Sequence, residues 1–227
     1  MFCARGGYGS LRTMEHLDWA VMAAAPPKIF VGSSDVTALH TVLGDRCGLV
    51  TLFAPMPATH AFVDDPVAAE QLRLALFRPQ DGLVLRGPAA ETLVPGRWSG
   101  VTAGGNLSLI AAQLGVPGRP LPPPGAIGLI EDVDEDPYRV DHLVTHLLHA
   151  GWFDRVGGLA LGSWHRCGAD LAAVRVVLAD RLGGLGVPIV WEHGFGHGPG
   201  QLTVPLGVEA ELDASAATLT LLEPALA

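Results

Sequence analysis

Short apolar runs alternate with stretches of helical periodicity in the first third of the chain. Residues 29–31 and 50–53 are apolar runs with the length of buried strands, and residues 36–43 between them have the spacing of a helix. Residues 1–4 resemble the end of a further strand, and residues 11–25 have helical spacing. Because strands and helices in alternation are typical of a parallel α/β layer, we expect an α/β fold.

The rest of the chain continues the alternation. Helices are predicted over 66–77, 138–150 and 171–182, and a glycine turn enters another helix within 104–115. Strands are predicted over 126–132, 156–161 and 187–191, followed by two closing strands over 203–212 and 218–222.

Composition narrows the classes of function. The chain has 227 residues, 49% of them hydrophobic, and a net charge of −9, so we expect no nucleic-acid surface, which would need a basic patch. The cysteines Cys3, Cys47 and Cys167 show no C-x-x-C spacing, which favours reduced thiols and a cytoplasmic location. No uninterrupted apolar run reaches 18 residues, so we expect no membrane span.

The segment Gly32-Ser33-Ser34-Asp35 lies where an apolar strand turns into a helix. With Ser34 it fits the first part of the nucleophile-elbow pattern G-x-S-x-G, although Val36 stands where the last glycine would be. The N–H groups at a helix start stabilise negative charge, which suits a serine whose substrate develops an oxyanion. The alternative is that Ser34 or Asp35 caps the helix.

Two other segments carry chemistry at strand ends. Glu131 directly follows apolar Ile130 at the carboxyl end of a predicted strand, where α/β proteins place functional groups; the alternative is a solvated acidic loop. His193 and His197 lie in a glycine-rich loop after another strand, where an imidazole can act as a general base. The alternative there is a polar loop tip.

Three patterns favour a structural interpretation. His142, His146 and His149 recur along one predicted helix, and we expect an exposed stripe because no acidic or thiol ligand shares their spacing. Residues 104–106 could hold a phosphate, but so short a signal favours a tight connection. Arg139 could bind a substrate carboxylate or form a surface ion pair.

Ser34, Glu131 and His197 together supply a nucleophile, an acid and a base, the logic of a catalytic triad. At this point the sequence strongly resembles the LD-carboxypeptidase family of serine peptidases, which includes muropeptide LD-carboxypeptidases and microcin C self-immunity peptidases. The matching segments are "ARGGYGS", "PKIFVGSSDVTALH", "GGNLSLIAAQLG", "LIEDVDEDPYRVDHL", "GWFDRVGGLALGSW" and "GFGHGPGQLTVPLGV". They occur in the order of the family and cover nearly the whole chain.

The resemblance implies Ser34 as nucleophile, His197 as base and Glu131 as the acid that orients it. It places the backbone N–H groups of Gly6 and Asp35 at the oxyanion hole. It implies a partial Rossmann-like N-terminal domain over 1–60, a linker region over 61–97 and a β-rich α/β C-terminal domain over 98–227. The family is usually dimeric, so a homodimer is expected, with no cofactor and no metal.

The implied reaction is removal of terminal D-Ala from murein tetrapeptides in peptidoglycan recycling, with Arg139 as a candidate for binding substrate charge. The alternatives are a microcin C immunity-type peptidase acting on peptidyl or aminoacyl nucleotides, an inactive remnant, and a flavodoxin-like nucleotide binder that would use Gly6 and Gly104.

The sequence departs from the family in four places. Ser33 stands where an aromatic residue usually precedes the nucleophile, "FAPM" replaces "HGPM", and His142 replaces a common arginine. Family members also have strands and helices before "ARGGYG", so the chain is expected to be shortened at its N-terminus, with an unpaired sheet edge and exposed apolar surface.

Overall fold

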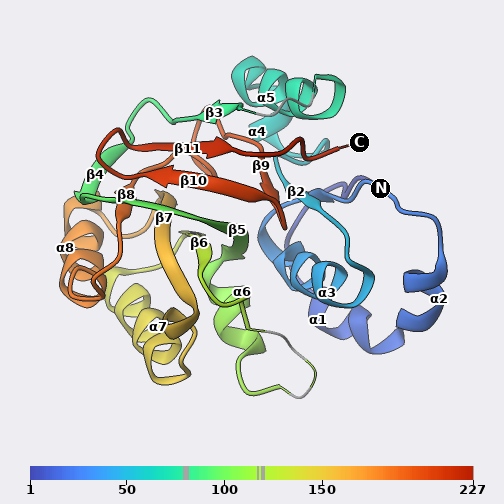
Figure 1. Ribbon diagram of the computed structural model, residues 1–227, viewed down its shortest axis with the longest axis horizontal. Coiled ribbons are helices and arrows are strands. Elements are labelled where there is room, and N and C mark those ends of the chain that lie inside the picture. Colours follow the sequence, from blue (N-terminus) through green and yellow to red (C-terminus); the bar gives the residue numbers. More distant parts are fainter. Residues whose placement is uncertain (79–81, 117, 119–120, 227) are drawn as a thin grey trace.

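The computed structural model describes residues 1–78, 82–116, 118 and 121–226, so residues 79–81 of the predicted linker lie outside the described part. Its strands form a large curved sheet and a smaller sheet beside it, and helices pack against both (Figure 1). The α/β prediction is confirmed. Among the described helices, none combines the length and the hydropathy needed to cross a lipid bilayer.

The smaller sheet, counted over the described residues, has three strands in the order β1 (Val31–Gly32), β2 (Thr51–Phe53) and β9 (Val204–Leu206). Strands β1 and β2 are parallel, and β9 runs antiparallel to β2. The predicted first strand is reduced to one parallel bridge between Phe2 and Val31. The side chain of Phe2 is about half exposed, at 51%.

The larger sheet has eight strands within the described residues. Their order is β3 (Val84–Leu85), β11 (Thr218–Leu221), β10 (Glu209–Asp213), β5 (Arg97–Asn106), β6 (Ala126–Val133), β7 (Val156–His165), β8 (Ile189–Trp191) and β4 (Glu91–Val94). Strands β5 to β8 are parallel, and the others pair antiparallel with their neighbours. Strands β3 and β4, from the predicted linker, form its two edges.

The helices follow the same order along the chain. They are α1 (Ser10–Thr13), α2 (Trp19–Ala24), α3 (Thr37–Cys47), α4 (His60–Val63), α5 (Pro66–Phe77), α6 (Leu107–Gln113), α7 (Pro137–His149) and α8 (Leu171–Leu182), with 3₁₀ turns at Met14–His16, Ser34–Val36 and Phe153–Arg155. Helices α6, α7 and α8 lie on one side of the larger sheet (Figure 1).

The prediction of one helix over residues 11–25 is wrong. The chain is extended at Leu17, and a new helix, α2, begins after Asp18. The carboxylate of Asp18 accepts hydrogen bonds from the N–H groups of Ala20 and Val21 at 3.0 and 3.1 Å. This side-chain cap satisfies N–H groups that a continuous helix would have bonded internally, so the segment divides.

The predicted strand over residues 203–212 is also wrong as a single element. It is two strands, β9 in the smaller sheet and β10 in the larger. Between them, the N–H of Gly207 donates to the backbone oxygen of Thr102, and the N–H of Thr102 donates to the oxygen of Val208. These bonds hold the chain against β5 at the point where it passes from one sheet to the other.

Strand β6 is buried on both faces. Ile127 and Leu129 pack in an apolar cluster with residues of β10 and β11. Ile130 belongs to another cluster, which includes Val144 of α7 and Leu178 of α8. A parallel strand covered on both faces reads as a continuous apolar run, which is why the sequence revealed it.

Candidate active site

Ser34 lies at a sharp turn between β1 and α3. Ser33 is extended, and Ser34 then adopts a φ of 62°, in the left-handed region that a serine rarely occupies. The 3₁₀ turn Ser34–Val36 leads directly into α3. Such strain at a strand-to-helix turn is typical of functional sites, and it presents the serine at the N-terminus of a helical segment.

The helix-cap interpretation of this segment is wrong. Within the described residues, no side-chain cap bond is formed at the start of the 3₁₀ turn or of α3. The carboxylate of Asp35 instead accepts a hydrogen bond from the N–H of Ser10 at 2.9 Å, at the start of α1. Ser34 is therefore not occupied in capping its own helix.

Gly6 lies directly beside Ser34. A Cβ atom added at Gly6 would lie 2.8 Å from the Cβ and 2.9 Å from the Oγ of Ser34, so only glycine allows this approach of the backbone. Asp35 follows Ser34 in the chain. The two residues predicted to supply oxyanion N–H groups thus both adjoin Ser34, and their role stays a prediction.

Glu131 and His197 form a hydrogen-bonded pair at the carboxyl end of β6. Glu131 is fully buried, and its Oε2 accepts from Nδ1 of His197 at 2.7 Å. Burial by itself lowers the pKa of His197, but the charge and hydrogen bond of Glu131, with smaller contributions from Asp132 and Asp134, outweigh it and raise that pKa. A carboxylate in this position fixes the tautomer and the orientation of an imidazole.

Asn106 connects this pair to the helix that follows Ser34. Its side-chain amide donates to Oε1 of Glu131 at 3.3 Å and to Oδ1 of Asp132 at 2.8 Å. Its backbone N–H donates to the hydroxyl of Thr37, the first residue of α3, at 3.0 Å. We call this set of bonds the Thr37–Asn106 junction. Among the described residues, no hydrogen bond joins Ser34 to His197 directly, as is common before a substrate binds.

The other sequence patterns have structural roles. Strand β5 runs through Gly104 and Gly105 to Asn106, whose Oδ1 accepts from the N–H of Leu109 and caps α6, so the tight-connection interpretation is confirmed. His142, His146 and His149 are exposed on α7, as expected for a stripe. Over the part of the chain that the structure describes, no group of three His, Cys, Asp or Glu residues is arranged to hold a metal ion.

Arg139 lies on α7, where its guanidinium pairs with the carboxylate of Glu135 at 3.5 Å. Its side chain is 43% exposed. The structure therefore places it in an ion pair at the surface, and its predicted contact with substrate charge stays a prediction.

His193, the other histidine of the glycine-rich loop, is buried. Burial lowers its pKa to about 4. A solvent-excluded histidine of this kind is a poor general base near neutral pH, so the structure favours His197 for that role.

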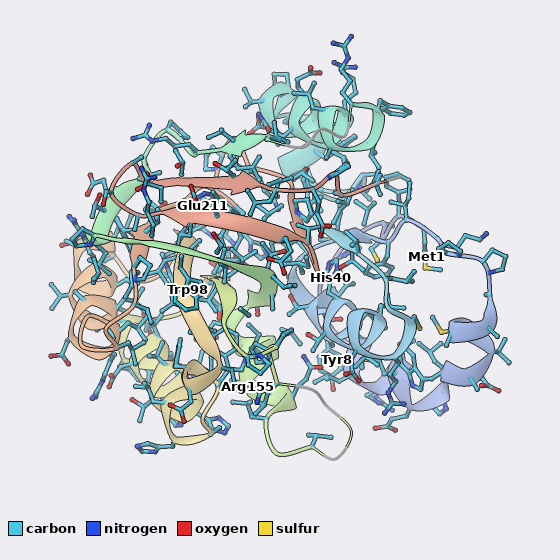
Figure 2. All side chains as sticks on the ribbon, in the orientation of Figure 1. Met1, Tyr8, His40, Trp98, Arg155 and Glu211 are labelled. Atoms are coloured by element: carbon cyan, nitrogen blue, oxygen red, sulfur yellow. The ribbon has the colours of Figure 1, made fainter. Side chains whose placement is uncertain are left out.

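A cavity of about 590 Å³ lies between the two sheets, away from these residues. Leu49, Val101, Ile110 and Trp152 are among its apolar lining residues, and neither Ser34 nor His197 lines it. Its wall includes His40, labelled in Figure 2 near the meeting of the N-terminal helices and the larger sheet. The cavity is therefore not the candidate active site.

Sequence reasoning missed Thr37 and Asn106 as residues that connect the site. A polar residue directly before the apolar run of α6 is a helix-start signal, which would have identified Asn106 as a cap. No sequence signal indicates that its amide also reaches Glu131, because that contact depends on the parallel register of β5 and β6.

Comparisons with known proteins match both ends of the described fold to one family. The family model of the LD-carboxypeptidase N-terminal domain matches residues 1–54, and that of the LD-carboxypeptidase C-terminal domain matches residues 99–212. A Streptomyces coelicolor protein named as a carboxypeptidase is 52% identical over 226 residues, covering 100% of this chain and 72% of that protein.

Two solved structures are similar in fold. The muramoyltetrapeptide carboxypeptidase from Oxalobacter formigenes has a TM-score of 0.82 and 27% identity, covering 97% of this chain and 76% of that one. MccF in complex with glutamyl sulfamoyl guanosine has a TM-score of 0.84 and 23% identity, covering 100% of this chain and 76% of that one.

Proposed function

Because the chain belongs to the LD-carboxypeptidase family, we propose that it is a serine carboxypeptidase that releases terminal D-Ala from murein tetrapeptides by hydrolysing an L,D-peptide bond. The observation that carries the proposal is the Glu131–His197 pair, joined through the Thr37–Asn106 junction to the helix that follows the strained Ser34. The name of the Oxalobacter structure supports a muropeptide substrate.

The hydrogen bonds of the pair define the direction of proton transfer. Nδ1 of His197 donates to Glu131, which leaves the lone pair of Nε2 free to accept the proton of the Ser34 hydroxyl. As Oγ of Ser34 attacks the scissile carbonyl carbon, His197 becomes an imidazolium, and the buried carboxylate of Glu131 stabilises that charge.

The N–H groups of Gly6 and Asp35 would donate hydrogen bonds to the carbonyl oxygen and stabilise the negative charge that develops on it. Both adjoin Ser34, and that of Asp35 lies at the start of a helical turn, where the helix dipole favours an anion. His197 then returns its proton to the leaving amine of D-Ala. A water molecule, activated by the same imidazole, hydrolyses the acyl-enzyme.

Arg139 is proposed to bind substrate charge from α7. We further propose that the enzyme acts as a homodimer in the cytoplasm, where recycled murein peptides are processed, and that it works without a cofactor. The acidic net charge of −9 supports a peptide and not a nucleic acid as partner.

The test is incubation of the purified chain with a murein tetrapeptide, followed by measurement of free D-Ala. Replacement of the proposed nucleophile in Ser34→Ala should lower release by about 10⁶-fold, to the residual rate that binding and the oxyanion hole supply. Ser215→Ala, a change of an exposed serine in the turn between β10 and β11, should retain full release.

Release that survives Ser34→Ala would remove the triad from the proposal. Turnover of an aminoacyl sulfamoyl adenylate in place of the tetrapeptide would replace the substrate with that of the immunity peptidases. A folded chain that turns over neither substrate would contradict the enzyme proposal altogether.

A further inference from the structure

His197 is carried by a loop with little stiffness of its own. Gly194 and Gly196 have φ values of 102° and 122°, which few other residues adopt, and Gly198 follows His197. Glycine loses more conformational entropy on ordering than any other residue. A loop of this composition therefore needs contacts from outside itself to hold the imidazole against Glu131.

Ser163 supplies such contacts from β7, the strand next to β6. Its hydroxyl oxygen accepts hydrogen bonds from the backbone N–H groups of His197 and Gly198, both at 2.9 Å. Its own N–H donates to the backbone oxygen of Phe195 at 2.7 Å. One buried residue, 6% exposed, thus binds the loop at Phe195, before the imidazole, and at His197 and Gly198.

The loop lies directly on Ser163 and Glu131 together. A Cβ atom added at Gly196 would lie 2.5 Å from Oγ of Ser163 and 2.7 Å from Oε2 of Glu131. The hydroxyl and the carboxylate therefore face the same stretch of backbone. Ser163 fixes the main chain of His197, and Glu131 fixes its ring.

We propose that Ser163 is a positioning residue of the carboxypeptidase site, whose hydroxyl holds the His197 loop so that the imidazole remains bonded to Glu131 and aimed at the nucleophile. This inference rests on the proposed function for its kinetic consequence. The positional part, that the hydroxyl maintains the His197–Glu131 bond, is independent of the substrate.

Removing the hydroxyl has a defined structural consequence. In Ser163→Ala, the N–H groups of His197 and Gly198 lose their acceptor, and the glycine-rich loop relaxes toward solvent to satisfy them. The imidazole then spends less time on Glu131. Ser163→Thr keeps the hydroxyl on a residue that suits a strand, so it should restore the contacts.

The kinetic test compares these variants on a murein tetrapeptide. Ser163→Ala should lower kcat by about 10- to 100-fold with KM unchanged within about twofold, because the base is misplaced while the binding surface remains. Ser163→Thr should recover most of the loss. Ser215→Ala is the matched control, since its hydroxyl also accepts a backbone N–H, that of Gly96 at 3.3 Å, far from the site.

The second test follows the ring of His197 by NMR and needs no substrate. The charged and titratable groups that face the ring are Glu131 and Asp132 on β6, Asp134 just after that strand, and His165 at the end of β7. Loss of the Glu131 bond should lower the pKa of His197 measurably in Ser163→Ala and leave it unchanged in Ser163→Thr. His197→Ala identifies the signal.

The outcomes separate the two proposals. Wild-type kcat and wild-type pKa of His197 in Ser163→Ala would overturn the positioning role, and so would a loss of kcat with the pKa unchanged. A lowered pKa in a chain that releases no D-Ala would support the positioning role and contradict the proposed function. If Ser163→Ala does not fold, Ser163→Cys, with a weaker acceptor of similar size, should show an intermediate pKa.

Discussion

The two sheets hold their parts of the candidate site in different ways. In the larger sheet, the Asn106 side chain donates a hydrogen bond to Glu131 on the buried strand β6, and the Ser163 hydroxyl on the buried strand β7 accepts one from the N–H of His197. In the smaller sheet, Ser34 lies just after a strand of two residues, and its backbone adopts a φ of 62°. Glu131 and His197 are thus held by side-chain contacts, whereas the alignment of Ser34, the proposed nucleophile, with them depends on the Thr37–Asn106 junction.

This difference predicts that substitutions in the two regions will have different effects. A change in the larger sheet should alter the chemistry without unfolding the protein, because many contacts remain. A change at the junction should weaken the association of the two sheets themselves. The following predictions test each side of that contrast.

Of these predictions, the largest effect is expected in the larger sheet, from Glu131→Gln. The amide keeps the size of the side chain but offers an N–H or a neutral oxygen to His197, so it no longer stabilises the imidazolium, and kcat should fall by about 10⁴-fold. The measurement is D-Ala release, with circular dichroism to verify the fold. Glu211→Gln on β10 (Figure 2) is the control with full activity, and equal rates in both variants would refute the role of Glu131.

The next effect concerns the junction. In Gly105→Ala the new Cβ would lie 2.7 Å from the Thr37 side chain, at a φ of 138° that alanine disfavours. We expect a loss of about 3 kcal/mol in the free energy of unfolding, measured by urea denaturation. Gly115→Ala, also at positive φ (75°) but with no atom within 4 Å of the new Cβ, should cost only about 1 kcal/mol. Equal costs would mean that the contact with Thr37 is unimportant.

The third test is the dependence of stability on pH. His40, on α3 beside the smaller sheet, and His193, just after β8 of the larger sheet, are both buried, and burial lowers the pKa of each to about 4. Below pH 6.5 the unfolded chain takes up a proton on His193 that the folded chain accepts only near pH 4, so stability falls as the pH falls through that window. For one such histidine the loss between pH 7 and pH 5 is about 2 kcal/mol.

His193→Leu removes the contribution of His193 to this loss of stability at low pH. Its free energy of unfolding, relative to the wild type in urea denaturation, should therefore rise by about 2 kcal/mol when the pH is lowered from 7 to 5. His40 is less suitable for replacement, because its ring donates to the oxygen of Gly32 and accepts from the hydroxyl of Thr51. Parallel pH profiles of the wild type and His193→Leu would contradict the prediction.

The smallest effect is expected at the surface. If Arg139 binds substrate charge, Arg139→Ala should raise KM by about tenfold, the equivalent of one charged hydrogen bond, and leave kcat unchanged. Its stability should change by less than about 0.5 kcal/mol, because its ion pair with Glu135 is exposed. Arg73→Ala, which removes the matching surface pair with Glu70 on α5, should alter neither constant.

Local signals were sufficient for much of the fold. The bounds predicted for α5 and α8 agree with the structure, since Asp65 and Asp170 cap their first turns and Pro66 occupies the first position of α5. The long helix over 11–25 failed because an internal Asp18 cap outweighed the apolar spacing. The sequence predicted β9 and β10 as one strand, because the division between them depends on contacts with β5, which no local pattern contains.

The candidate site shows the same limit. Ser34, Glu131 and His197 could be chosen because each follows a predicted strand, His197 in a glycine-rich loop, and the family motifs agree. Ser163 could not, since a serine within the apolar run of β7 gives no sign of which loop it faces. The hydrogen bond from Ser10 to the carboxylate of Asp35 was also not predicted, because the sequence indicated a role only for its backbone N–H.

The two contacts of Asp35 limit which residues can replace it. Its backbone adjoins Ser34, the proposed nucleophile, while its side chain accepts a hydrogen bond from Ser10 and so holds the short segment that begins at Gly6. A longer side chain would displace that segment, and an apolar one would release it. We therefore expect only residues with a short acceptor to be tolerated at position 35, so a saturation library screened for D-Ala release should return Asp and Asn and reject Glu and Ala.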